Sequence, residues 1–120
     1  MTNTAAYAPF TVLVNFENGQ LSCDPNPLEI PADTIATITW ARSPSSNFVF
    51  LTFEWLHSNG FPTQDPIVHN ECVVSVVKNT ELSTRGSDWP YVLKVQVGDR
   101  VYQTGSTEVG TNGKPVIHTQ

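Results

Sequence analysis

The segment at residues 34–41 constrains the fold more than any other part of this chain. Its apolar residues Ala36, Ile38 and Trp40 alternate with threonines. Alternation with a period of two places one face of a strand against a core and the other against water. A turn-rich segment with three prolines, residues 24–31, precedes it. The pattern therefore predicts a half-buried β-strand that follows a corner, which is typical of a small β-sandwich.

The rest of the chain repeats this arrangement of short strands and turns. Asn18-Gly19 and Gly98-Asp99 favour hairpins, because such residues tolerate positive φ. Apolar residues on both faces of 47–55 predict a central strand covered on each side. The polar segment 79–88 predicts a loop with room for a short helix. We expect further strands near residues 10–16, 72–78, 91–97 and 100–104, and a short edge strand or a tail in 106–120. These turn signals predict an antiparallel sandwich of about seven to nine strands.

The composition agrees with a single all-β domain. A chain of 120 residues fits one domain, since single domains most often have roughly 100–150 residues. We expect one domain over residues 1–120, with an ordered core at about 8–110. Charged residues make up 14% of the chain, and there are nine prolines and seven glycines. That profile suits short strands with frequent turns and does not suit a helical bundle.

The charge distribution bears on the partners and the compartment. The net charge is −5, and the six basic residues are scattered with no two adjacent. Binding to nucleic acid needs clustered Lys and Arg, so we expect neither nucleic acid nor an anionic membrane as a partner. The first residues lack the basic and apolar regions of a signal peptide. No apolar run approaches the ~20 residues of a membrane-spanning helix. We therefore expect a cytoplasmic protein.

Several short motifs resemble known families. The Asp24-Pro25 corner, the Thr-Ile-Thr-Trp strand ending at Trp40 and the late hairpin resemble a cupredoxin-like or immunoglobulin-like sandwich. Asp24-Pro25 together with Glu108-Val109 and Lys114-Pro115 resembles the bacterial DP-EP family over about residues 10–116. The Glu-Pro half of that name is absent here as adjacent residues. The resemblance implies a bacterial single-domain sandwich and no established activity.

The residues do not support the copper site that a cupredoxin would hold. Such a site needs two His and one Cys, usually with a weak axial Met. The only methionine is Met1, and no cysteine follows Cys72. Where the first copper-binding His would follow the Trp40 strand, the chain has Asn47-Phe48. We therefore expect no copper and no other cofactor.

One cluster comes closest to a set of metal ligands. Asp65, His69, Glu71 and Cys72 lie within one short segment. A structural zinc site normally offers four ligands in two pairs, and no second Cys or His pair exists here. We therefore predict no metal site. If a metal did bind, these four residues would be the candidate ligands. We interpret His69 as a surface histidine and Cys72 as the start of a buried strand.

The two cysteines imitate an immunoglobulin pattern incompletely. Cys23 and Cys72 flank Trp40, but the tyrosine expected two residues before the second cysteine is Asn70. Disulfides are rare in the cytoplasm, so we expect two free thiols.

The sequence leaves three classes of function open. Low charge and the β-branched segment Val73 to Val77 favour a homo-oligomer, because sandwich edges must be paired or protected. A non-catalytic protein that acts through binding or self-association is therefore the first interpretation.

The second interpretation is a carbohydrate or small-ligand binding module that uses Trp89, because exposed aromatic rings stack on sugars. A Trp before Pro at a strand start also fits a packing cap, and Trp40 and Trp55 are expected in the core. A hydrolytic or metal-dependent enzyme is third. The sequence has no Gly-x-Ser-x-Gly elbow and no glycine-rich phosphate loop.

Overall fold

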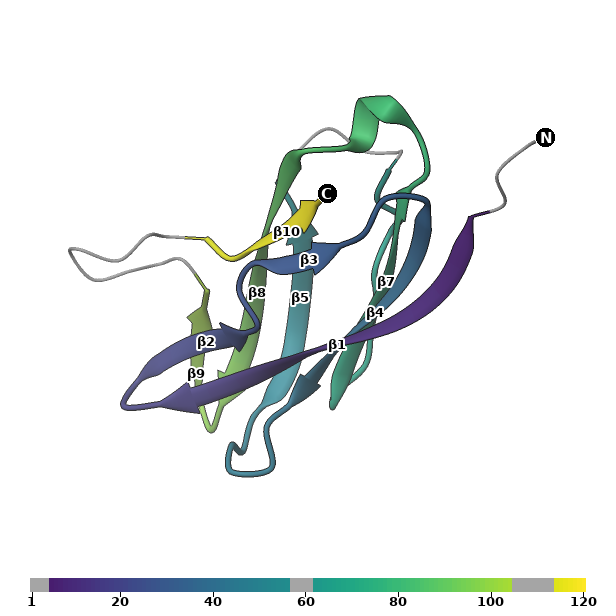
Figure 1. Cartoon of the computed structure of the whole chain (residues 1–120). Helices are drawn as coiled ribbons and strands as arrows, with labels where there is room; N and C mark the ends of the chain where they lie inside the picture. The colour runs from purple at the N-terminus through teal and green to yellow at the C-terminus, as the bar shows by residue number, and fades with distance from the viewer. Residues whose placement is uncertain (1–4, 57–61, 105–113) are drawn as a thin grey trace.

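Two β-sheets pack face to face in the structure, a computed structural model that describes residues 5–56, 62–104 and 114–120 (Figure 1). One sheet has the strand order β2-β1-β4-β7-β6, and the other has the order β3-β10-β8-β5 with β9 beside β8. The described elements are β1 (Ala6–Glu17), β2 (Gln20–Asp24), β3 (Leu28–Ile30), β4 (Thr34–Arg42), β5 (Val49–Trp55), β6 (Ile67–Val68), β7 (Cys72–Asn79), the 3-10 helix η1 (Leu82–Thr84), β8 (Ser87–Val97), β9 (Arg100–Gln103) and β10 (Val116–Thr119). The predicted all-β sandwich is confirmed.

Two strand pairings depart from the expected antiparallel pattern. Strand β1 runs parallel to β4, and β10 runs parallel to β3. The other named strand pairs are antiparallel. Parallel neighbours need a crossover between them. Here the chain leaves the first sheet after β2, passes through β3 in the opposite sheet and returns as β4. Alternation of residues does not reveal strand direction, so the sequence could not show this.

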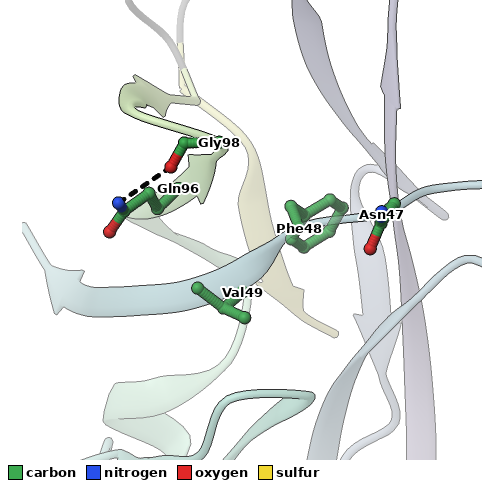
Figure 2. Close-up of a pocket in the computed structure, with 5 residues that line it drawn as sticks. All are labelled: Asn47, Phe48, Val49, Gln96 and Gly98. Carbon is green, nitrogen blue, oxygen red and sulfur yellow. Dashed lines mark hydrogen bonds between the residues drawn. The ribbon is translucent and has the colours of Figure 1, made fainter.

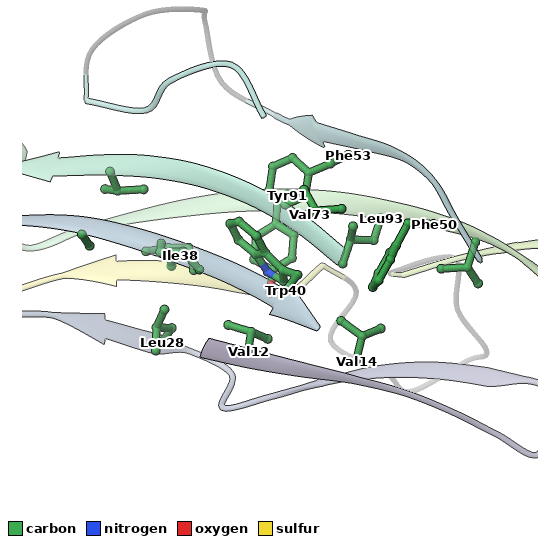
Figure 3. Close-up of a cluster of buried hydrophobic side chains, with 14 of the residues drawn as sticks. Val12, Val14, Leu28, Ile38, Trp40, Phe50, Phe53, Val73, Tyr91 and Leu93 are labelled. Carbon is green, nitrogen blue, oxygen red and sulfur yellow. The ribbon is translucent and has the colours of Figure 1, made fainter. Parts of the chain in front are cut away.

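The predicted alternation places the core between the sheets. In β4, Ala36, Ile38 and Trp40 are fully buried, whereas Thr37 is exposed. The predicted β1–β2 hairpin is also present, with positive φ at Asn18 (54°) and at the glycine after it (76°). Figure 3 shows the core side chains from both sheets, among them Val12, Val14, Ile38, Trp40 and Val73 of the first and Leu28, Phe50, Phe53, Tyr91 and Leu93 of the second.

Strand β5 is not the central strand that its two-sided apolar pattern predicted. It ends its sheet and, among the described strands, its ladder is with β8 alone. The register shifts between Phe50 and Thr52, which marks a β-bulge. Phe50 and Phe53 are therefore both buried although three positions separate them, and Leu51 is exposed. A bulge adds one residue and changes the phase of alternation. The apolar pattern of the sequence therefore suggested that both faces of β5 are covered, although only one face is.

The C-terminal segment belongs to the sheet interior. We predicted a short edge strand or a tail, but β10 lies between β3 and β8. Ile117 is fully buried, so the core extends past the predicted limit near residue 110. The Glu108-Val109 motif lies outside the described residues.

The polar loop at 79–88 contains η1, as the sequence allowed. The fully buried amide of Asn79 connects this loop to the ends of β3 and β10, which are neighbours in the second sheet. Its Nδ2 lies 3.1 Å from the Ile30 carbonyl oxygen, 3.0 Å from that of Pro31 and 3.0 Å from that of Gln120. Its Oδ1 accepts from Thr84 Oγ1 at 2.9 Å. One amide therefore holds four chain segments together.

Candidate functional site

The two sheets end on the same side of the sandwich at β5 and β6. These strands close the strand orders of their sheets and lie beside one another. The Phe50 N–H donates to the Asn70 carbonyl oxygen at 2.9 Å, which joins β5 to the turn after β6. Sheet ends of this kind are where a sandwich is prone to pair with another chain.

Four aliphatic residues on these two sheet ends are exposed. Ile67 is 60% exposed, Leu51 38%, Leu56 37% and Val68 36%. We call these four residues the β5–β6 surface. The other large hydrophobic residues that are exposed in the described ranges are spread over β1, η1 and β9: Tyr7, Leu13, Leu82 and Val101. Exposed apolar side chains on sheet ends are places where another chain can pair, so this surface is the candidate functional site.

The charged side chains on β5 and directly before β6 are acidic. Glu54 in β5 and Asp65 just before β6 are both exposed. Neither strand contains Lys, a residue with which natural sandwiches often protect a free edge. The bulge in β5 is another such device, and it lies at Leu51. The β6 half of the surface therefore offers the least protected apolar contact.

The segment from which the sequence predicted oligomer formation lies elsewhere. Val73 to Val77 belongs to β7, between β4 and β6. Val73 and Val77 are fully buried. The segment before β6 also pairs with β7: the Gln64 N–H donates to the Val76 carbonyl oxygen at 2.9 Å, so the backbone edge of β7 is covered there as well. The exposed residues Ile67 and Val68 form too short a run for a strand pattern to be recognised.

The four metal-ligand candidates lie around the β6–β7 turn without converging. Asp65 precedes β6, and the His69 N–H closes the turn by donating to the Cys72 carbonyl oxygen at 2.8 Å. The Glu71 carboxylate, which is 80% exposed, lies 3.7 Å from Arg42 Nη2. Cys72 is half-buried. In the part of the chain that the structure describes, no group of three or more His, Cys, Asp or Glu side chains is arranged to hold a metal ion.

Trp89 packs at the start of β8. Its half-buried ring lies against the core, opposite Ile117 of β10. The indole Nε1–H donates to Thr119 Oγ1 at 3.1 Å. This is the geometry of the packing cap that was the alternative to a sugar platform. Trp40 is fully buried and Trp55 packs against the core, as predicted.

A shallow depression of about 300 Å³ lies between the start of β5 and the β8–β9 turn. Figure 2 shows its lining residues, which are Asn47, Phe48, Val49, Gln96 and Gly98. The Gln96 Nε2 donates to the Gly98 carbonyl oxygen at 2.9 Å. None of these residues has a titratable side chain. The depression therefore supplies no acid, base or nucleophile.

Both cysteines are free thiols, as the sequence predicted. Burial raises the pKa of the Cys23 thiol from 9.0 to about 11, while the Tyr91 hydroxyl opposes this shift. Burial also raises the pKa of Tyr91 well above 10, and a charge on Cys23 would raise it further. The raised pKa of Cys23 contributes stability that is present below pH 9 and is lost as the pH rises through about 11.

Cys23 should therefore be alkylated more slowly than Cys72 in the folded protein. Raising a thiol pKa by two units lowers its thiolate fraction about 100-fold near neutral pH, and the thiolate is the reactive form. We expect iodoacetamide at pH 8 to modify Cys72 at least about tenfold faster, as measured by peptide mass spectrometry. The Cys23 rate should rise as the pH approaches 11. In urea the two thiols should react alike. Equal rates in the folded chain would contradict the raised pKa of Cys23.

The fold and the exposed side chains thus define a β-sandwich with an apolar surface where its two sheets end. No protein-family model and no curated protein matches this chain. In the described ranges, no helix is both long and apolar enough to span a bilayer.

Proposed function

We propose that this chain is a non-catalytic binding protein that self-associates through the β5–β6 surface. The observation that supports the proposal is that Leu51, Leu56, Ile67 and Val68 are all exposed on adjoining sheet ends. Removing such side chains from water contributes roughly 25 cal/mol per Å² of apolar area. The sequence expectation of a homo-oligomer is retained, with a different surface from the one it named.

A second copy of the chain suits this surface for a geometric reason. Closed two-fold dimers use the same patch on both subunits, so an apolar patch on one subunit contacts the same apolar patch on the other. Two-fold pairing would place Ile67 and Val68 of one copy against the same residues of the other. The nearby Glu54 and Asp65 then repel across the interface. Because salt screens such repulsion, the dimer should become tighter as NaCl rises.

The Ile67→Lys variant should dissociate the dimer. The new ammonium would have to be buried beside apolar side chains, so we expect the dissociation constant to rise at least about tenfold, or about 1.4 kcal/mol. Light scattering behind a sizing column measures this directly, since each chain has a mass of 13.2 kDa.

The matched control is Val101→Lys in β9. Val101 is 59% exposed and Ile67 is 60% exposed, so the two substitutions change similar surfaces in different places. We expect the Val101 variant to keep the wild-type mass. A monomeric wild-type chain at millimolar concentration would remove the proposal. Equal weakening by both lysines would place the interface elsewhere.

A further inference from the structure

Three titratable side chains form a rung across the second sheet, away from the β5–β6 surface. Glu29 of β3 and Asp88 of β8 both pair in register with His118 of β10. The His118 Nδ1 lies 2.7 Å from Asp88 Oδ1. On its other side, the His118 Nε2 lies 3.9 Å from Glu29 Oε1. The side chain of His118 is 32% exposed, so solutes can reach this rung.

The contact with Asp88 selects one form of the neutral imidazole. An ionised carboxylate only accepts hydrogen bonds, so the short contact places the proton on His118 Nδ1. The other nitrogen, Nε2, then carries a lone pair on the side where Glu29 lies. Histidines that bind metals show this arrangement: a carboxylate orients the ring through one nitrogen, and the metal takes the other.

We propose that His118 Nε2 and the Glu29 carboxylate bind a divalent zinc ion, with Asp88 as the positioning residue. Zinc lies about 2.0–2.2 Å from nitrogen and oxygen ligands, so one ion reaches two atoms that are up to about 4.2 Å apart. The observed 3.9 Å is within this limit. A tetrahedral ion prefers about 3.4 Å, and the Glu29 side chain, 46% exposed, has room to move closer. Water completes the coordination.

The surroundings define the class of ion. Imidazole nitrogen suits zinc and other late transition metals, whereas magnesium prefers a shell made of oxygen. The Gln120 Nε2, 3.3 Å from Glu29 Oε1, is the group that must give way when the ion binds. The site has two protein ligands, and Asp88 acts through the ring, so it differs from a closed structural centre with four ligands. Bound zinc would tie β3 to β10.

Calorimetric titration of the chelator-treated protein with Zn²⁺ tests the site. We expect one Zn²⁺ per chain and no uptake of Mg²⁺. The His118→Gln and Glu29→Gln variants should each weaken zinc binding at least about tenfold. The Asp88→Asn variant should weaken it by about 10–100-fold while leaving both ligands in place. The double variant His69→Gln/Cys72→Ser removes the nitrogen and sulfur donors of the other candidate cluster and should bind zinc like the wild type.

A second readout needs no substitution. In the wild-type chain, Zn²⁺ should shift the imidazole Nε2 resonance of His118 in ¹H–¹⁵N spectra and leave that of His69 unchanged. Absence of zinc uptake at 1 mM, or loss of uptake in the His69/Cys72 variant alone, would overturn the proposal. The solution mass, measured with and without EDTA, is expected to stay the same, which separates this site from self-association.

Discussion

The Trp40→Ala variant is expected to lose about 3–5 kcal/mol of unfolding free energy, the range typical of removing a buried aromatic side chain. Trp40 is fully buried. Its ring centroid lies 4.5 Å from that of Phe53, 5.3 Å from that of Tyr91 and 6.0 Å from that of Trp55. Alanine would leave a cavity between the two sheets that the surrounding rigid rings cannot fill. Small domains have only about 5–15 kcal/mol of stability in total.

Urea denaturation followed by circular dichroism measures this loss. Trp40→Phe is the matched control, because it keeps a ring at the centre of the cluster and should cost about 1–2 kcal/mol. The Trp40 Nε1 and the Tyr91 hydroxyl have no partner at hydrogen-bond geometry among the described residues, although Trp40 lies close enough to lower the pKa of Tyr91. Phenylalanine therefore gives up no well-formed hydrogen bond there. Equal losses in the two variants would show that ring packing does not determine stability at this position.

The Asn79→Ala variant is expected to lose about 3 kcal/mol, because a fully buried amide gives up several hydrogen bonds at about 0.5–1.5 kcal/mol each. Three backbone carbonyl oxygens and the Thr84 hydroxyl lie around this amide. The Ile30 oxygen keeps a second donor, the Gln120 N–H, and Thr84 Oγ1 also donates to the Glu81 carbonyl oxygen. The oxygens of Pro31 and Gln120 belong to exposed residues that water can reach, so the loss comes from the hydrogen bonds of the amide itself rather than from carbonyl groups left unpaired.

Equilibrium unfolding of Asn79→Ala and Asn47→Ala separates this effect from a general effect of the substitution. Asn47 is exposed, so its replacement should change the stability by less than about 0.5 kcal/mol. Hydrogen exchange should also show faster opening of β3 and β10 in the Asn79 variant alone. If the Asn79 variant were as stable as the Asn47 variant, the amide would be dispensable to the fold.

Local alternation predicted much of this fold, because a period of two depends only on which face meets the core. It predicted β4, β7 and β8 and both hairpins. It did not reveal strand direction. The bulge at Leu51 changed the alternation in β5, so the sequence predicted a central strand where the fold has an edge strand. The resemblances to the DP-EP family and to cupredoxin-like or immunoglobulin-like domains, the bacterial origin and the cytoplasmic location stay predictions.

The candidate sites were harder to predict because they are made by residues far apart in the chain. Glu29 and His118 become neighbours only through the parallel pairing of β3 and β10, which no local pattern indicates. The β5–β6 surface depends on which strands end the two sheets. By contrast, Asp65, His69, Glu71 and Cys72 are close in sequence, and this nearness made them look like a cluster.

The parallel pairing of β3 with β10 has a consequence for the speed of folding. The Val116 N–H donates to Asn26 Oδ1 across 90 positions of sequence, and β3 enters its sheet through β10. The chain has to lose the entropy of closing a long loop before such a contact can stabilise it. Domains rich in such contacts fold in roughly milliseconds to seconds. Until β10 pairs, the facing edges of β3 and β8 lack their hydrogen-bond partner. The contact between Glu29 and His118 therefore depends on closing this long loop.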